Sequence, residues 1–485
     1  MKENNTKKSV ISGLFWKFGE RLLTQGVAFV ISVVLARILA PEDYGTIALV
    51  NVFISLAAVF ISSGFATALI QKKDADDTDF STMFFCSLVC SLLIYAVLFC
   101  VAPWVALFYD IPVLKSILRV YALQIPLSVY HSIQAAYISR HMMFKKAFIT
   151  SVITSVLSGT VGIVMALAGM GVWALVAQSM AATAINTLIM TRLIPWRLEW
   201  KFSGASAKAM MQYGSRLLAA DLSGTFFNEL RSLIIGKLYT GADLAFYNKG
   251  NQVPHMLTGN LINVLQAVMF PALANHSDDL PQLKHLARRS MRIMSYVILP
   301  CMAGLFAVME PLILLLFTEK WAETIPYGQI LSIGLCFSLL SSFSLQTMKA
   351  IGRSDVVLGL EFKKKPVYLL TIILGATHSV MGLAISVVVY DFYAMIVNSW
   401  QMKKYIFYTM REQAKDTLPA ACLSVVMAAC VWVIPSMESL IFTLLIKVLA
   451  GILVYVLGSA LLRLEPFRYL CNLIRSYTSH QRSRG

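Results

Sequence analysis

Three arginines interrupt long apolar stretches of this sequence, at Arg21, Arg216 and Arg231. An ionised side chain at the centre of a bilayer costs roughly 2.5–3.5 kcal/mol, so such a group normally faces the interior of a helix bundle or a wet cavity. Guanidinium groups form strong paired hydrogen bonds with carboxylates and phosphates. The arginines therefore favour a cationic cavity that binds an anionic group. Arg21 and Arg216 lie near the ends of their apolar runs and also suit an alternative role, in which they snorkel to the membrane surface.

Carboxylates occur in the same stretches. Asp221 and Glu229 flank the second and third arginines, whereas Asp391 stands alone in the middle of an apolar run. Two interpretations stay open for these acids. They either pair with the arginines or hold a coupling ion or proton inside the membrane.

Further polar residues share helical faces with these charges. Gln25 follows Arg21 by four residues, which places both on one side of a helix. Such a stripe either lines a polar cavity or packs helix against helix. Lys365 ends a run of three lysines that follows Glu361. This run is either a basic collar at the mouth of the cavity or a group that snorkels to anionic lipid headgroups.

The resulting set of candidate cavity residues spans several apolar runs. It consists of Arg21, Gln25, Arg216, Asp221, Glu229, Arg231, Lys365 and Asp391. His131 and His255 also lie within apolar runs, as proton carriers or as hydrogen-bonded packing residues. The eight cysteines have no metal-ligand spacing and the chain has no phosphate-binding loop motif. We therefore predict no cofactor, no metal and no enzymatic activity, and leave the identity of a coupling ion open.

The elements that must position these residues are membrane-spanning helices. The chain is 58% hydrophobic and only 14% charged, and its apolar residues fall in runs of about 20, the length of a helix that spans a bilayer. In lipid the backbone must satisfy its own hydrogen bonds, which favours helices. We predict an all-α polytopic membrane protein with about fourteen spans, near 12–39, 44–70, 80–108, 114–138, 147–169, 171–191, 210–239, 244–271, 290–317, 325–350, 355–377, 380–401, 417–436 and 440–462.

Basic residues alternate between the predicted loops. Most of them collect in every second loop and at both ends of the chain, as expected when those segments are cytoplasmic. The opposite loops and helix ends hold only Lys115, Arg119, Lys237, Lys249 and Lys320. This alternation supports an even number of spans with both termini in the cytoplasm. The net charge of +16 is distributed in small groups, which argues against nucleic-acid binding.

Two helices of the predicted set open with similar residues. Gly19-Glu20-Arg21-Leu22-Leu23 resembles Gly214-Ser215-Arg216-Leu217-Leu218. Near the other end of each helix a second basic residue follows, Arg37 or Lys237, and an aspartate stands six residues after each of them, Asp43 or Asp243. Parallel repeats of this kind are a common plan of transporters. We therefore predict an N-lobe of helices 1–6 at 1–200, a C-lobe of helices 7–12 at 201–405, and helices 13–14 with a cytoplasmic tail at 406–485.

Several strings along most of the chain resemble the bacterial polysaccharide transporter family of the MOP superfamily, the Wzx-type and teichuronic-acid-type flippases. They are Ala36–Gly45, Gln134–Arg140, Gly171–Gln178, Ala245–Lys249, Val253–Pro254, Phe270–Leu273 and Ile351–Asp355. The resemblance implies a two-lobed, MATE-like fold and an alternating-access transporter in the bacterial inner membrane. It also implies that an oligosaccharide linked through diphosphate to a polyprenol moves from the cytoplasmic to the outer leaflet.

On this reading Arg21 and Arg216 contact the diphosphate and Arg231 is a deeper cavity cation. The implied partners are membrane lipid, a polysaccharide polymerase and glycosyltransferases. Two other functions remain as alternatives. A MATE-like exporter of drugs or other small molecules prefers an acidic cavity, and a membrane-embedded polysaccharide polymerase typically carries a long extracytoplasmic loop that this sequence lacks.

Overall fold

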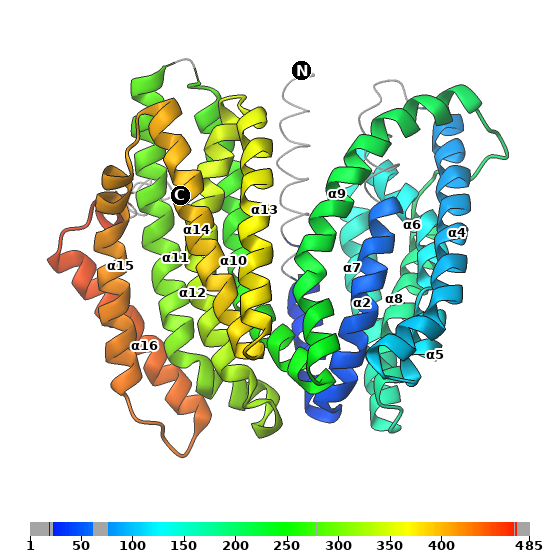
Figure 1. Cartoon of the computed structure of the whole chain (residues 1–485), viewed down its shortest axis with the longest axis horizontal. Helices are drawn as coiled ribbons and strands as arrows, with labels where there is room; N and C mark the ends of the chain where they lie inside the picture. Colours follow the sequence, from blue (N-terminus) through cyan, green and yellow to red (C-terminus); the bar gives the residue numbers. More distant parts are fainter. Residues whose placement is uncertain (1–18, 20–22, 62–75, 278, 470, 473–485) are drawn as a thin grey trace, which may run out of the picture. The chain divides into compact units, whose positions relative to one another are not determined.

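The computed structural model describes residues 19, 23–61, 76–277, 279–469 and 471–472. Within this part of the chain the regular structure is helical, with no strand (Figure 1). The helices are Leu23–Ile38, α2 (Pro41–Ile61), α4 (Asp77–Tyr109), α5 (Val113–Tyr121), α6 (Gln124–Arg140), α7 (Phe144–Leu167), α8 (Val172–Leu193), α9 (Gly204–Leu238), α10 (Gly241–Ala274), α11 (Leu280–Phe317), the short η2 (Glu319–Trp321), α12 (Thr324–Ala350), α13 (Ser354–Ala376), α14 (Val380–Ile406), α15 (Met410–Val433) and α16 (Leu440–Leu461).

Nine of the described helices are long and apolar enough to cross a membrane. Helices α9, α10 and α13 fall outside this group although each has at least 23 residues. They carry many of the polar and charged residues singled out above, which lower their hydropathy. Large apolar side chains such as Trp104, Leu107 and Leu449 are exposed on the surface, as expected for a lipid-facing exterior. The prediction of an all-α polytopic membrane protein is confirmed.

One predicted span is divided in the structure. Residues 114–138 form two consecutive helices, α5 and α6, which are separated at Ala122 and Leu123. Pro126 explains the break, because proline has no N–H to donate and its ring clashes with the carbonyl group four residues earlier. Restarting the helix at Gln124 places this proline in the first turn, where it is tolerated.

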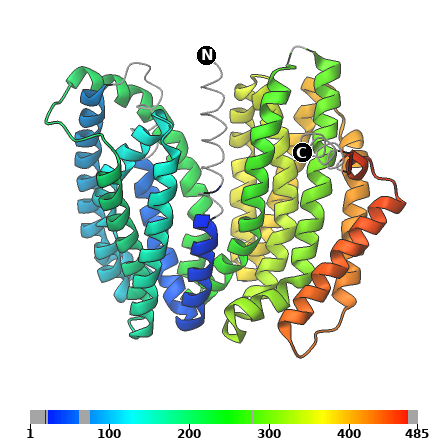
Figure 2. The same ribbon diagram turned by 180° about the vertical axis from the view of Figure 1, so that it is seen from behind.

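The chain divides into two compact units, Met1–Ala245 and Phe246–Gly485. In the first unit α7 packs against α8, and α2 and α4 both contact α9 (Figure 2). Helix α9 therefore clusters with the first unit, whereas the sequence repeat assigns it to the beginning of the second lobe. The lobe boundary near residue 200 stays a prediction.

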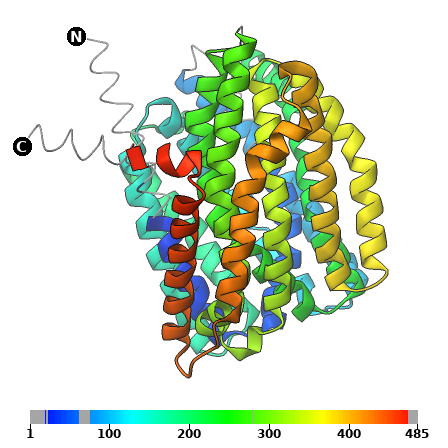
Figure 3. The ribbon, with the colours of Figure 1, turned by 90° about the vertical axis from the view of Figure 1, so that its left-hand side faces the viewer.

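In the second unit α11 has a central place. It contacts α12, α15 and α16, and α14 packs against both α12 and α13. Figure 3 views this unit from the side on which α16 lies beside α15. Tyr296 of α11, Leu423 and Met427 of α15 and Tyr455 of α16 form a shared apolar cluster. Helices α15 and α16 are thus integrated into the second unit.

The two turns of the internal repeat have related capping bonds. The backbone N–H of Ala40 donates to Asp43 at 3.2 Å before α2, and that of Thr240 donates to Asp243 at 3.0 Å before α10. Within the first unit the two helix beginnings also touch, because a Cβ atom placed on Gly45 would lie 1.8 Å from the carbonyl oxygen of Gly241. Only a glycine permits this backbone approach.

Candidate functional site

Helix α9 carries four of the candidate cavity residues. It has 35 residues and begins after Ser203, whose hydroxyl caps the helix by accepting from the backbone N–H of Ser206 at 3.3 Å. A helix of this length rises about 50 Å, which exceeds the hydrocarbon thickness of about 30 Å. Its charged residues are therefore spread over both the membrane interior and an extension beyond it.

The structure connects Glu229 of α9 to Ser55 of α2. The Ser55 hydroxyl donates to the Glu229 carboxylate with an Oγ–Oε1 distance of 3.2 Å. Both residues are partly buried, and Arg231 is also partly buried two positions further along the helix. Asp221 is exposed. The C-terminal half of α9 thus places the carboxylate of Glu229 and the guanidinium group of Arg231 against other helices of the first unit.

The other arginines of the set are described less fully. Arg21 lies outside the described residues, and the side chain of Arg216 does as well, although its backbone belongs to α9. Gln25 lies in the helix Leu23–Ile38 and is partly buried. The assignment of these three residues to a substrate cavity stays a prediction.

Asp391 and Lys365 belong to the second unit. Asp391 of α14 is partly buried and faces α12, since a Cβ atom on Gly334 would lie 3.5 Å from its Oδ2. Lys365 of α13 is partly buried. Its neighbour Lys364 is almost fully buried and donates to Glu361 with an Nζ–Oε1 distance of 2.6 Å. One lysine of the predicted basic collar is therefore neutralised within its own helix.

Polar residues of the first unit also pair between helices. The hydroxyl of Tyr121 in α5 donates to Asn51 of α2 at 3.0 Å, and that of Ser179 in α8 donates to Gln124 of α6 at 3.1 Å. Asn51 and Gln124 therefore each accept a hydrogen bond that joins two packed helices. His131 of α6 is partly buried among these helices.

Sequence reasoning missed a network of charges that connects α11 to α15. Arg288 forms two hydrogen bonds with Asp416, Nε–Oδ2 at 2.8 Å and Nη2–Oδ1 at 3.0 Å. Arg292 also donates to Asp416, at 2.8 Å, and Lys284 forms an ion pair with Glu412 at 2.8 Å. The carboxylate of Asp416 is 4% exposed, so the two arginines replace the water it has lost.

Spacing gives the signal that would have revealed this network. Lys284, Arg288 and Arg292 repeat every four residues, as do Glu412 and Asp416, so each set lies on one helix face. The charge alternation assigns Lys284, Arg288 and Arg292 to a cytoplasmic loop, and it does not show which helix faces which.

Tyr408 completes the network from the segment between α14 and α15. Its side chain is fully buried, and its hydroxyl donates to Asp416 at 2.8 Å. Burial, together with the nearby negative charge of Asp416, raises the pKa of Tyr408. The tyrosine therefore remains a donor, and the carboxylate binds one hydroxyl and two guanidinium groups.

In the described part of the chain no three His, Cys, Asp or Glu side chains lie close enough together to hold a metal ion. Arginines and lysines can neutralise an anionic group, and hydroxyl and amide groups can solvate a polar one.

The sequence matches the family described as polysaccharide biosynthesis protein over residues 34–326. Three curated relatives share this similarity. The succinoglycan biosynthesis transport protein ExoT of Rhizobium meliloti is 23% identical over 72% of this chain and 71% of its own length. The lipopolysaccharide biosynthesis protein WzxC of Escherichia coli is 22% identical over 67% of each chain. The teichuronic acid biosynthesis protein TuaB of Bacillus subtilis is 20% identical over 62% of each.

Solved structures show the same fold. The lipid II flippase MurJ in its inward closed conformation matches with a TM-score of 0.73 and 16% identity, over 95% of this chain and all of that chain. An inward-facing multidrug resistance MATE transporter of the MOP superfamily matches with a TM-score of 0.61 and 14% identity, over 81% of this chain and 98% of that one. These similarities show a fold of the MOP superfamily, as the sequence predicted.

Proposed function

The chain belongs to the polysaccharide biosynthesis protein family, and from this premise we propose that it is a flippase for lipid-linked oligosaccharides. It moves saccharide units linked through diphosphate to a polyprenol from the cytoplasmic to the outer leaflet by alternating access. The family match over residues 34–326 carries this proposal. The names of the relatives support it, since they place a transport protein and two further proteins in the synthesis of extracellular or surface polysaccharides.

The charges of the candidate site suit this substrate. A diphosphate that leaves water requires cationic partners with several hydrogen-bond donors. We assign this role to Arg21 and Arg216, with Arg231 as a deeper cation and Lys365 near the cytoplasmic mouth. Gln25 and the neighbouring polar stripe solvate sugar hydroxyls. The multidrug exporters share the fold, but that similarity supports no drug substrate for this chain.

The acids of the set have a second role in this proposal. Asp221, Glu229 and Asp391 pair with the cations or hold a coupling ion while the protein changes conformation. The protein works in a bacterial inner membrane with both termini in the cytoplasm. Glycosyltransferases supply its substrate and a polysaccharide polymerase consumes its product, so these enzymes are its functional partners.

Reconstitution into liposomes tests the site assignment. A fluorescent polyprenyl-diphosphate oligosaccharide is incorporated, and the fraction that reaches the opposite leaflet is followed over time. We compare wild type with Arg21→Ala, Arg216→Ala and the double variant. Lys201→Ala is the matched control, because Lys201 is an exposed cation that precedes α9 and forms an ion pair with the nearby Glu199.

We expect each arginine variant to slow movement on the order of tenfold, the effect of losing one charge-assisted hydrogen bond of about 1.5–3 kcal/mol. The control variant should retain the wild-type rate. Wild-type activity in the double variant would remove the two arginines from the site while leaving the flippase function standing. Absence of movement by the wild-type protein would instead contradict the function.

A further inference from the structure

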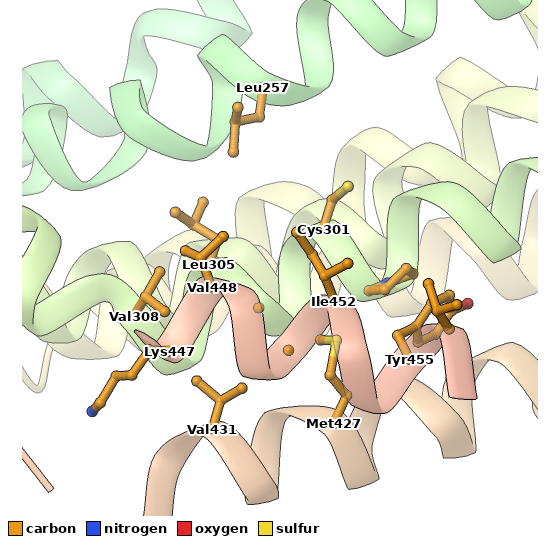
Figure 4. A pocket seen from close by; sticks show the side chains of 14 residues that line it. Leu257, Cys301, Leu305, Val308, Met427, Val431, Lys447, Val448, Ile452 and Tyr455 are labelled. Atoms are coloured by element: carbon orange, nitrogen blue, oxygen red, sulfur yellow. The ribbon is translucent and has the colours of Figure 1, made fainter. Parts of the chain in front are cut away.

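The second unit contains an apolar groove that the transport site does not use. Helices α10, α11, α15 and α16 enclose it, with a volume of about 390 Å³ (Figure 4). Its walls include Leu305 of α11, Met427 of α15 and Ile452 of α16. The volume lies within the range of small-molecule pockets, about 300–1,000 Å³. An apolar lining of this kind excludes a saccharide, whose hydroxyls would lose their hydrogen bonds.

Two glycines leave the groove open. Gly304 of α11 and Gly451 of α16 both line it. A Cβ atom on Gly304 would meet only the methyl group of Met427, at 3.5 Å, which is an ordinary van der Waals distance. The backbone at Gly304 therefore accepts a side chain, and a larger residue there would occupy the groove itself.

One charged residue, Lys447, lines this groove. It lies at one end, beyond Val431 and Val308, whereas Tyr455 lies at the other (Figure 4). Lys447 is 6% exposed, and its ammonium group has no hydrogen bond or ion pair with the described residues. The Tyr455 hydroxyl is already engaged, since it donates to the carbonyl oxygen of Tyr296 at 2.8 Å. The ammonium nitrogen keeps some access to its surroundings, and a cation without an anionic partner at this position favours a bound anion.

The position of Lys447 in its helix fits a lipid head group. It is the eighth residue of α16, about 10 Å along the helix from Leu440. A lysine at this depth extends its long stem toward the nearer membrane surface. The groove then continues along α16 toward Tyr455, in the direction that a hydrocarbon chain takes into the bilayer.

We propose that this groove binds an anionic glycerophospholipid of the surrounding membrane, with its phosphate on Lys447 and one acyl chain along α11 and α16. The charge decides the choice of occupant. A phosphodiester carries one negative charge and matches one ammonium group, whereas a diphosphate requires several cationic partners. The site is therefore distinct from the proposed substrate cavity.

Native mass spectrometry of the full chain in detergent, with added dioleoyl phosphatidylglycerol, tests the proposal. Lys447→Met removes the charge at similar size, Lys447→Arg retains it, and Gly304→Leu fills the groove. Lys403→Ala is the control, because Lys403 is an exposed cation of α14. The melting temperature of each variant without lipid shows whether it folds.

We expect Lys447→Met to weaken phosphatidylglycerol binding on the order of tenfold, the loss of one hydrogen bond to a charged group. Lys447→Arg and Lys403→Ala should bind as wild type does, and Gly304→Leu should bind weakly. The lipid should raise the melting temperature of wild type but not of Lys447→Met, whose lipid-free form should be at least as stable.

Two further probes separate the source of the phosphate. Glycerol phosphate, which has no acyl chains, should not bind. A polyprenyl diphosphate at equal concentration should not displace phosphatidylglycerol. Equal phosphatidylglycerol binding by wild type and Lys447→Met would overturn the proposal, as would stronger binding of the polyprenyl diphosphate. Because these measurements involve no transport, their failure leaves the flippase function untouched, and failure of transport leaves this site standing.

Discussion

Arg288 of α11 holds Asp416 of α15 through two parallel hydrogen bonds of 2.8 and 3.0 Å. The two residues are 128 positions apart in the chain. Arg292 donates to the same carboxylate and also pairs with Glu465, which follows α16. One buried acid thus organises a contact among α11, α15 and the segment after α16. Together with the apolar cluster around Tyr296, this contact joins the last two helices to the second unit.

Replacing Asp416 with alanine should destabilise the protein. Removing one partner of a buried ion pair typically costs about 3–5 kcal/mol of stability. Because both arginines are partly exposed, we expect a loss of about 3 kcal/mol for this variant. The melting temperature in detergent reports the loss. Asp355→Ala is the matched control, because its pair with Arg353 is exposed and should contribute at most about 1 kcal/mol. Equal melting temperatures for the two variants would contradict the role of the network.

Tyr408→Phe removes one hydroxyl from the same network while it retains the ring. The loss of a hydrogen bond to a charged group predicts a destabilisation of about 1.5–3 kcal/mol at neutral pH. The raised pKa of Tyr408 adds a pH dependence. Above about pH 10 the unfolded tyrosine loses its proton and the folded one does not, so the advantage of wild type over the variant should shrink there. An advantage that grows with alkaline pH would contradict this account.

Gly45→Ala should disturb the close contact between the beginnings of α2 and α10. The added Cβ atom would overlap the carbonyl oxygen of Gly241, and because that atom belongs to the backbone it cannot swing aside. Overpacking of this kind typically costs about 1–3 kcal/mol. Gly26→Ala is the control, since a Cβ atom at that helical glycine meets nothing within 4 Å. Yield and melting temperature of the purified variants measure the difference.

Glu229→Gln separates the charge of this residue from its packing. Glutamine still accepts the hydrogen bond from Ser55, so the melting temperature should change little. If the carboxylate pairs with a cavity cation or holds a coupling ion, flipping should slow on the order of tenfold. Ser55→Ala should show the opposite pattern, with a loss of about 1 kcal/mol in stability and flipping retained. Wild-type flipping by Glu229→Gln would assign this acid to packing alone.

The helical fold was accessible from sequence because the bilayer imposes one strong rule. Apolar runs of about 20 residues must form helices, and most of the predicted spans coincide with helices of the structure. The single span over 114–138 was wrong in detail, since hydropathy alone does not register the break before Pro126. At that point the proline interrupts the helix although the apolar pattern continues through it.

Partnerships between helices were not accessible in the same way. The spacing of Lys284, Arg288 and Arg292 fits one helix face, but nothing in the sequence indicates that this face meets Asp416. The groove beside Lys447 is a property of four helices together, so no single stretch of sequence contains it. For the substrate cavity, the structure connects Glu229 to Ser55, while the roles of Arg21 and Arg216 remain predictions.

The purified protein in liposomes that contain a fluorescent polyprenyl-diphosphate oligosaccharide gives the most direct test of the proposed function. We measure the rate at which the labelled saccharide lipid becomes accessible on the opposite leaflet. This rate is compared with the rate for the same lipid in protein-free liposomes, and with the rate for a labelled phospholipid in liposomes that contain the protein. Our account predicts rapid protein-dependent movement of the diphosphate-linked saccharide and none of the phospholipid. A rate for the saccharide lipid equal to that in protein-free liposomes would contradict it.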